Sequence, residues 1–241
     1  MTACTDQIAV VTGASSGVGK AIALGLAAQG ATLCLMGRQR DTLEAVAAQA
    51  RGAAQRVLCY QTDLVLDDDI QKTTECLKCE FGGIDILVHS AGVIALGRLE
   101  FTPVADLDWH YRANVRAPYT LTQALLPMLR LRRGQIVFVN SSVGLNARAN
   151  VGQYAATKHA LKALADSLRE EVNPAGLRVM SIYLGRTASP MQASVHEMEG
   201  KTYHPEHLMQ PEDVAAVVLN ALSLPRSAEV TDISMRPLRK S

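Results

Sequence analysis

Tyr154 and Lys158 are the two residues of this sequence whose types and spacing best suit proton transfer. They stand four residues apart in the run GQYAATKHALKALADSL, whose pattern predicts a helix. Since this spacing is about one helical turn, the phenol and the ammonium are expected on the same helix face. A free tyrosine has a pKa of about 10, and a neighbouring positive charge favours its phenolate. We therefore expect Lys158 to lower the pKa of Tyr154, so that the pair can give and take a proton.

Composition narrows the class of protein. The chain has 241 residues, enough to bury its own core, and 48% of them are hydrophobic, which excludes a disordered chain. Lys and Arg (24) nearly balance Asp and Glu (23), so no overall field favours nucleic acid as a partner. No apolar run approaches the roughly 20 residues that cross a bilayer, and the start of the sequence lacks a signal-peptide pattern. We expect a cytoplasmic protein that binds neither nucleic acid nor membrane.

Possible metal ligands occur only in isolated pairs. The five cysteines are an odd number, and Cys76 and Cys79 have CxxC spacing without a second CxxC or a histidine pair to complete a zinc set. His204 and His207 form a similar isolated pair. We therefore expect no metal site.

Short β-rich runs alternate with helical patterns along the chain. Strands are predicted at residues 7–12, 31–36, 56–61, 84–89, 135–140, 177–183 and 229–235. Helices are predicted at residues 17–29, 41–51, 67–81, 103–130, 152–173 and 211–222, with Asp41 as an N-cap. Parallel neighbours need crossover helices, and near-continuous apolar strands indicate a sheet covered on both faces. We predict one domain, residues 1–241, built on a Rossmann-type doubly wound parallel sheet of seven strands.

A glycine-rich segment, Thr12-Gly-Ala-Ser-Ser-Gly-Val-Gly19, separates the first predicted strand from the first helix. Glycine lets the backbone come close to a phosphate, and the helix N-terminus offers free N–H groups. A nucleotide-triphosphatase loop would need Gly at position 14 and Ser or Thr at position 21, and both are Ala. A turn that simply requires glycine is the remaining alternative to a dinucleotide site. The loop residues expected to contact the dinucleotide are Gly13, Ser15, Ser16, Gly17, Val18 and Gly19.

Arg38, after the second predicted strand, indicates which dinucleotide binds. A free ribose 2′-hydroxyl is usually held by an acidic side chain near this position, whereas a 2′-phosphate requires arginine. Residues 31–40 contain no Asp or Glu. We therefore favour NADP(H) over NAD(H), although Arg38 could also be a solvated loop charge.

In the order and spacing of its motifs, the sequence resembles the short-chain dehydrogenase/reductase family over nearly its whole length. The glycine loop is similar to TGxxxGxG, and Tyr154 with Lys158 is similar to YxxxK. Further matches to family motifs are Asp63-Leu64, Ala91-Gly92, Asn114 and Ser141, which precedes Tyr154 by the family spacing.

The resemblance implies a role for each matching residue. Tyr154 would be the general acid/base of hydride transfer between a nicotinamide and a carbonyl or alcohol carbon, and Ser141 would hydrogen-bond the reacting oxygen. Lys158 would also hold the nicotinamide ribose, and Asn114 would organise water that links Lys158 to solvent. Additional cofactor contacts are expected from Asp63, Leu64, Ser90, Ala91, Gly92, Gly185, Thr187 and Ser189.

The sequence departs from the family pattern at two places. His89-Ser90 replaces Asn-Asn, and Leu184-Gly185 replaces Pro-Gly. Residues 143–153 and 186–209 are expected to select the substrate. Their polar side chains allow a polar or anionic substrate. The second segment is long enough to form a mobile lid.

We therefore predict an NADP(H)-dependent oxidoreductase that acts on a small carbonyl or alcohol. One alternative is a non-catalytic NADP(H)-binding sensor or interaction protein, against which the presence of Tyr154 and Lys158 argues. The other is an epimerase that uses the cofactor transiently. A homodimer or homotetramer packed through the helices at residues 103–130 and 152–173 is what the resemblance implies.

Overall fold

The computed structural model describes residues 4–238 and is organised around one seven-stranded sheet. All neighbouring strands are parallel, in the order β3-β2-β1-β4-β5-β6-β7. The strands are β1 (Ile8–Thr12), β2 (Thr32–Gly37), β3 (Arg56–Gln61), β4 (Ile86–His89), β5 (Gln135–Ser141), β6 (Arg178–Leu184) and β7 (Asp232–Met235). The doubly wound parallel sheet predicted from the sequence is confirmed.

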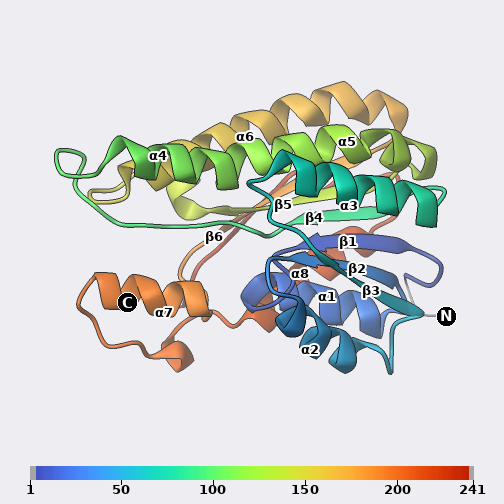
Figure 1. The fold of residues 1–241 in the computed structure, drawn as a ribbon, viewed down its shortest axis with the longest axis horizontal. Helices are drawn as coiled ribbons and strands as arrows, with labels where there is room; N and C mark the ends of the chain where they lie inside the picture. The colour runs from blue at the N-terminus through green and yellow to red at the C-terminus, as the bar shows by residue number, and fades with distance from the viewer. Residues whose placement is uncertain (1–3, 239–241) are drawn as a thin grey trace.

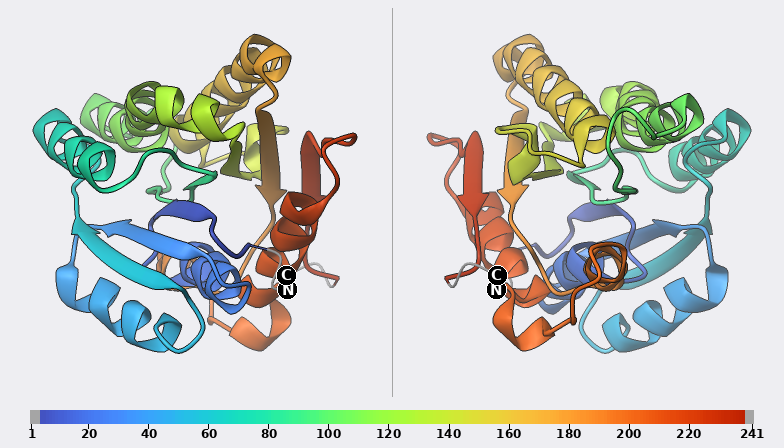
Figure 2. Two further views of the ribbon diagram at one scale, coloured as in Figure 1. Left: turned by 90° about the vertical axis from the view of Figure 1, so that its right-hand side faces the viewer. Right: turned by 90° about the vertical axis from the view of Figure 1, so that its left-hand side faces the viewer.

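Helices cover both faces of the sheet (Figures 1 and 2). One layer holds α1 (Gly17–Ala28), α2 (Arg40–Ala50) and α8 (Pro211–Ser223). The opposite layer holds α3 (Asp67–Glu80), α4 (Val104–Tyr111), α5 (Ala117–Arg132) and α6 (Gly152–Val172). Helix α7 (Pro190–Met198) projects at the end of the sheet where β6 finishes.

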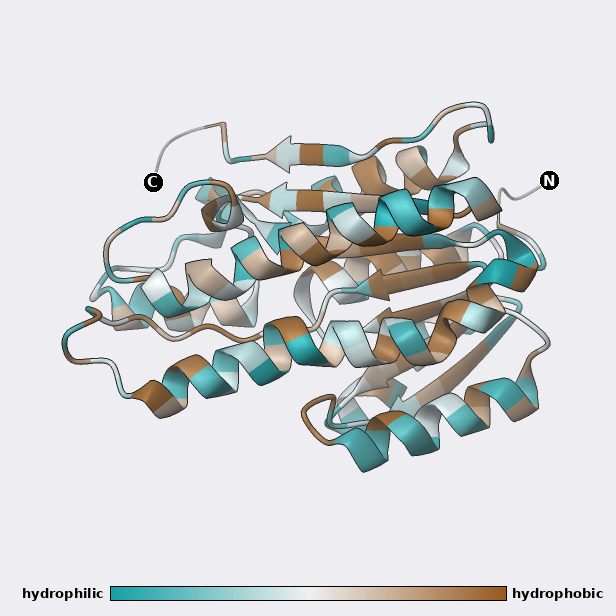
Figure 3. Cartoon of the chain, turned by 90° about the horizontal axis from the view of Figure 1, so that it is seen from above, coloured by the Kyte–Doolittle hydropathy of each residue, from teal (hydrophilic) through white to brown (hydrophobic). Residues whose placement is uncertain are grey.

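Alternation along the strands produces a separate core on each face. Ala9 and Val11 of β1 pack in the core beneath α1, α2 and α8, whereas Val10 packs in the core beneath α3, α5 and α6. Because successive side chains point to opposite faces, a strand buried on both sides must be apolar throughout. Figure 3 shows this as brown central strands beneath helices of mixed colour.

The winding of the sheet reverses between β1 and β4, which makes this the switch point where ligands of such sheets bind. The hydroxyl of Thr12, at the end of β1, accepts hydrogen bonds from the backbone N–H groups of Ser90 (3.0 Å) and Ala91 (3.1 Å). It donates to the carbonyl of Val88 at 3.2 Å. One side chain therefore fixes how the ends of β1 and β4 lie relative to each other.

Most predicted boundaries agree with the structure to within two residues, and three larger or more informative differences have a physical reason. Helix α2 begins at Arg40, so Gln39 and not Asp41 is its N-cap residue, and Asp41 lies in the first turn. Strand β7 begins at Asp232 rather than at 229, because the Glu229 side chain accepts the N–H of Val179 (2.8 Å) where a strand would offer a backbone carbonyl. The helix predicted over 103–130 is α4 and α5 joined by a π-helical turn, Arg112–Arg116.

Helix α7 was not predicted within residues 186–209. Its first turn is set by Ser189, whose hydroxyl accepts the N–H of Gln192 at 3.1 Å, and by Pro190 at the first helical position. The segment also contains a short 3₁₀ turn, Pro205–His207. Across residues 4–238, no helix is both long and apolar enough to span a bilayer.

Candidate active site

A cavity of about 990 Å³ lies at the carboxyl ends of the strands, around the switch point. The predicted site residues that line it are Gly13, Ser15, Ser16, Gly17, Val18, Arg38, Asp63, Leu64, Ser90, Ala91, Gly92, Ser141, Tyr154, Lys158, Gly185, Thr187 and Ser189. Two predicted site residues, Gly19 and Asn114, are not in the lining. The fold thus brings together segments spread over most of the sequence.

The glycine loop is close-packed, which explains its glycines. Gly13 and Gly17 have positive φ angles of 64° and 52°, a conformation that L side chains rarely adopt. A Cβ on Gly13 would lie 2.8 Å from the backbone nitrogen of Ala91, and one on Gly19 would lie 2.4 Å from the carbonyl oxygen of Gly13. Gly19 therefore does not line the cavity, but its lack of a side chain lets the start of α1 pack against the backbone of the glycine loop.

The N-terminus of α1 faces this cavity without a side-chain cap. Ser16, the N-cap residue, has extended backbone and makes no capping hydrogen bond. First-turn N–H groups of a helix carry partial positive charge and bind phosphate oxygens. Together with the glycine loop, this end of α1 has the shape and donors that a dinucleotide pyrophosphate requires.

Tyr154 is 8% exposed, and burial governs its acidity. Burial raises the pKa of Tyr154 to about 12, and a hydrogen bond with Ser141 opposes that rise. The expectation that Lys158 lowers this pKa does not hold in this structure. The Lys158 ammonium lies 5.8 Å from the centre of the Tyr154 ring, and desolvation by burial is the largest cause of the shift in the pKa of Tyr154.

Lys158 is 5% exposed, and its ammonium donates to one protein acceptor, the carbonyl of Val139, at 3.2 Å. Burial lowers the pKa of Lys158 to about 8. An ammonium can donate three hydrogen bonds, so Lys158 can take further acceptors from a ligand in the cavity.

Asn140 holds the end of β5 against α6. Its amide nitrogen donates to the carbonyl of Lys158 at 3.1 Å, and its amide oxygen accepts the N–H of Ser141 at 2.7 Å. A Cβ on Gly144 would lie 2.8 Å from that amide oxygen and 3.0 Å from the Lys158 carbonyl. This tight junction fixes the position of Ser141 relative to Tyr154 and Lys158.

Asn114 lies in the π-helical turn, 1% exposed, with its side chain fully engaged by protein groups. Its amide accepts the N–H of Val93 (2.9 Å) and donates to the Val93 carbonyl (3.0 Å) and to the Thr157 hydroxyl (3.2 Å). Asn114 thus secures the segment after β4. Its role in organising water stays a prediction.

His110 and Gln153, which sequence reasoning missed, hold the next part of that segment. His110 accepts the N–H of Ala95 (2.9 Å) through Nε2 and donates to the Asp106 carbonyl (2.6 Å) through Nδ1. Gln153 donates to the carbonyl of Ala95 at 3.1 Å. Since both partners are backbone groups, no side-chain pattern in the sequence could have indicated them.

Arg38 and Asp63 line the end of the cavity nearest β2 and β3. Asp63 accepts the N–H of Val65 at 3.2 Å, which shapes the turn after β3. Arg38 is exposed at the end of β2, where its guanidinium can reach a ligand on that side.

His89, which replaces the Asn of the family pattern, has a structural role in the core. His89 is 4% exposed, stacks on Phe138 with ring centres 4.9 Å apart, and bonds the Thr122 hydroxyl at 2.7 Å. Burial lowers its pKa to about 3, so the ring is neutral. At the other departure, the N–H of Gly185 donates to the Met235 carbonyl at 2.8 Å, so β7 secures the backbone there.

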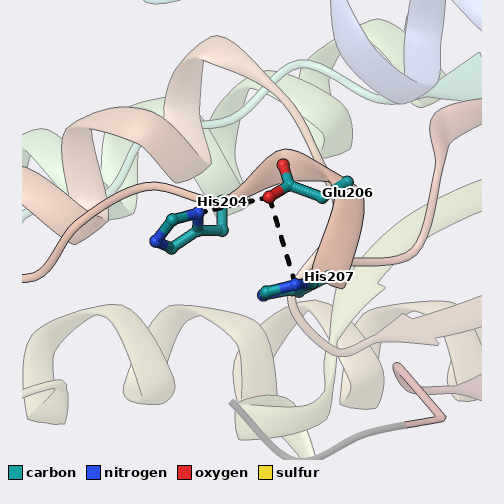
Figure 4. Close-up of side chains that lie close together, drawn as sticks. All are labelled: His204, Glu206 and His207. Atoms are coloured by element: carbon teal, nitrogen blue, oxygen red, sulfur yellow. Dashed lines mark hydrogen bonds and ion pairs between the residues drawn. The ribbon is translucent and has the colours of Figure 1, made fainter.

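The pair His204 and His207 has a third possible metal ligand between its members, Glu206 (Figure 4). One Glu206 oxygen lies 3.2 Å from His204 Nδ1 and 4.0 Å from His207 Nε2. All three side chains are exposed, and none lines the cavity. This cluster has donor types that suit a divalent cation but is separate from the candidate active site.

Comparison with known proteins decides the family. The family model described as short chain dehydrogenase matches residues 7–200. An uncharacterized oxidoreductase of Staphylococcus aureus is 33% identical over 239 residues, which cover 99% of this chain and 100% of that protein. The chain belongs to the short-chain dehydrogenase family.

Solved structures of two other oxidoreductases resemble this one over nearly the whole chain. An alcohol dehydrogenase of the archaeon Thermococcus sibiricus, complexed with 5-hydroxy-NADP, is 26% identical with a TM-score of 0.87, covering 98% of each chain. A metagenomic short-chain oxidoreductase in complex with NADP is 29% identical with a TM-score of 0.84, covering 99% of this chain and all of the other.

Replacing Lys158 by Met is expected to stabilise the folded protein at pH 7 by about 2 kcal/mol, because a poorly solvated ammonium is removed at the cost of one hydrogen bond. Lys158 titrates at about 8 when folded and near 10.5 when unfolded. Between these values the unfolded chain binds the extra proton, so wild-type stability rises with pH and the advantage of the variant shrinks. Denaturant unfolding from pH 7 to pH 10 measures this difference.

Lys162→Met is the matched control, because this neighbouring lysine is 37% exposed and paired with Asp166. It is expected to give no stabilisation that fades with pH. A Lys158→Met difference that stays constant over the whole range would contradict the account.

Proposed function

We propose that this short-chain dehydrogenase is an NADP(H)-dependent oxidoreductase that moves a hydride between nicotinamide and a small carbonyl or alcohol substrate. The observation that carries the proposal is the placement of Tyr154, which lines the dinucleotide-sized cavity together with Ser141 and stands one helical turn from Lys158. A sensor that only bound the cofactor would not need this arrangement of groups.

The residues around the cavity fit the cofactor. The glycine loop and the uncapped end of α1 would hold the pyrophosphate, and Arg38 would hold the ribose 2′-phosphate. Asp63, Leu64 and the segment Ser90–Gly92 would lie along the adenosine. NADP in the solved relatives supports this assignment.

Bound nicotinamide supplies the hydride, and the protein supplies the proton. Tyr154 would donate its phenolic proton to the carbonyl oxygen, while Ser141 stabilises the charge developing on that oxygen. The Lys158 ammonium would stabilise the phenolate left behind and hold the nicotinamide ribose. Gly185, Thr187 and Ser189 also line the cavity and would position the carboxamide and phosphates.

The protein is proposed to be a homodimer or homotetramer that packs through α4, α5 and α6. Apolar side chains remain exposed along α4, with Val104 at 73%, Leu107 at 41% and Tyr111 at 52%. Three apolar side chains at helical spacing on one exposed face are typical of an interface.

Tyr154→Phe is expected to lower kcat by about a thousandfold, because the proton donor is lost while the cavity keeps its shape. Affinity for NADPH, measured by calorimetry, should change little. Tyr119→Phe, an exposed tyrosine on α5, is the matched control and should keep its activity. Full turnover in Tyr154→Phe would show that another group transfers the proton.

Arg38→Ala is expected to weaken NADPH binding by about tenfold or more and to leave NADH binding nearly unchanged, because only the former carries the 2′-phosphate. Arg40→Ala provides the control, since Arg40 lies outside the cavity lining, 3.5 Å from Glu44. Equal losses for the two cofactors in Arg38→Ala would remove the assigned role.

Light scattering should give twice or four times the mass of one chain for the wild type. Leu107→Asp places a charge on the exposed face of α4 and should shift the protein towards a monomer. A monomeric wild type, or an assembly unaffected by Leu107→Asp, would contradict packing through this face.

A further inference from the structure

Apart from the residues assigned to the cofactor, the lining of the cavity is mainly apolar. The apolar side chains include Val93, Ile94 and Leu96 after β4, Trp109 of α4, Val143 after β5 and Met191 of α7. Tyr154 and Ser141 line the same cavity as these apolar side chains. Because such surfaces select apolar ligand surface, the body of the substrate is expected to be apolar.

Most charged groups in the lining already have a partner or a place in the proposed cofactor site. Arg38 and Asp63 belong to the adenosine end, and Lys158 belongs to the proton-transfer group. Arg186 donates two hydrogen bonds to the Glu199 carboxylate, at 2.7 Å and 2.8 Å, so these two charges neutralise each other.

Arg148 and Arg236 remain, and within residues 4–238 neither forms an ion pair. Arg236 follows β7, with its Cα 3.2 Å from where a Cβ of Gly185 would stand, against the backbone assigned to the nicotinamide side. Arg148 instead lies on the loop between Ser141 and Tyr154. It is therefore the unpaired cation on the substrate side.

A backbone hydrogen bond joins the loop that carries Arg148 to the segment after β4. The N–H of Gly97, in the segment after β4, donates to the carbonyl of Asn150 at 2.9 Å. Asn150 itself has a positive φ of 66°, so the chain turns sharply two residues after Arg148. Arg148 itself is exposed and lines the cavity, so its guanidinium is open to a substrate group remote from the reacting carbon.

We infer that Arg148 binds a carboxylate at the remote end of the substrate, so that the enzyme interconverts oxo acids and hydroxy acids with an apolar body. The guanidinium fork matches the two oxygens of a carboxylate. This inference rests on the proposed oxidoreductase function and specifies its substrate class.

A matched pair of aldehydes tests the inference: para-carboxybenzaldehyde and its methyl ester differ in the remote charge but react at the same group. With NADPH, wild-type kcat/KM should favour the acid by about tenfold, the worth of one hydrogen-bonded charge pair. Arg148→Gln should remove this preference, mainly through KM, and Arg148→Lys should retain part of it.

Two controls isolate Arg148 from a general effect of charge. Arg236→Gln removes the other unpaired arginine of the lining that has no place in the proposed cofactor site, and Arg226→Gln removes an exposed arginine outside the lining. Both should keep the wild-type preference for the acid. Equal use of acid and ester by the wild type, an unchanged preference in Arg148→Gln, or its loss in Arg236→Gln would overturn the inference.

Calorimetry separates this inference from the function on which it rests. Tyr154→Phe loaded with NADPH should bind the acid about tenfold more tightly than the ester, and the double variant with Arg148→Gln should not discriminate. If no carbonyl compound is turned over but this difference in binding persists, the proposed reaction fails while Arg148 keeps its role. If turnover occurs and the difference is absent, Arg148 is the part that fails.

Discussion

Burial of Tyr154 and Lys158 on one turn of α6 is the constraint on which the candidate site depends. Burial moves both groups away from their ionised forms, raising the pKa of Tyr154 to about 12 and lowering that of Lys158 to about 8. Exposed groups at the same spacing would lose much of their influence to water. The protein thus holds a phenol that keeps its proton until a charge develops beside it, and an ammonium short of acceptors.

The fold supplies this buried position through a few short-range contacts at the ends of strands. Thr12 joins the ends of β1 and β4, and Asn140 joins the end of β5 to the carbonyl of Lys158. Asn114 and His110 hold the segment after β4, which lines the same cavity as Tyr154. Since parallel strands end at one edge of the sheet, these contacts lie around a single cavity with the glycine loop at one end.

Local signals in the sequence predicted the sheet and the glycine loop, whereas the resemblance to the family supplied many of the other predicted residues that line the cavity. Strands buried on both faces are apolar runs, and a loop that must approach another backbone needs Gly13. The wrong predictions concern segments whose structure depends on contacts with residues distant in the sequence. The extent of β7 depends on Glu229 and Val179, and the π-helical turn surrounds an Asn114 that bonds Val93. The predicted lowering of the Tyr154 pKa by Lys158 was wrong, because the spacing of two residues in the sequence does not show how strongly burial desolvates them. Helix α7 did have a local signal, Ser189 followed by Pro190.

Titration of Tyr154 tests most directly whether this buried phenol is the proton donor. With ¹³C-labelled tyrosine and Tyr154→Phe to assign the signal, NMR reports the pKa in the free protein and in its complex with NADP⁺. The account predicts a pKa near 12 in the free protein and a clear decrease in the complex, because a positive nicotinamide ring nearby favours the phenolate. An ordinary pKa near 10 in the free protein, unchanged by NADP⁺, would contradict it.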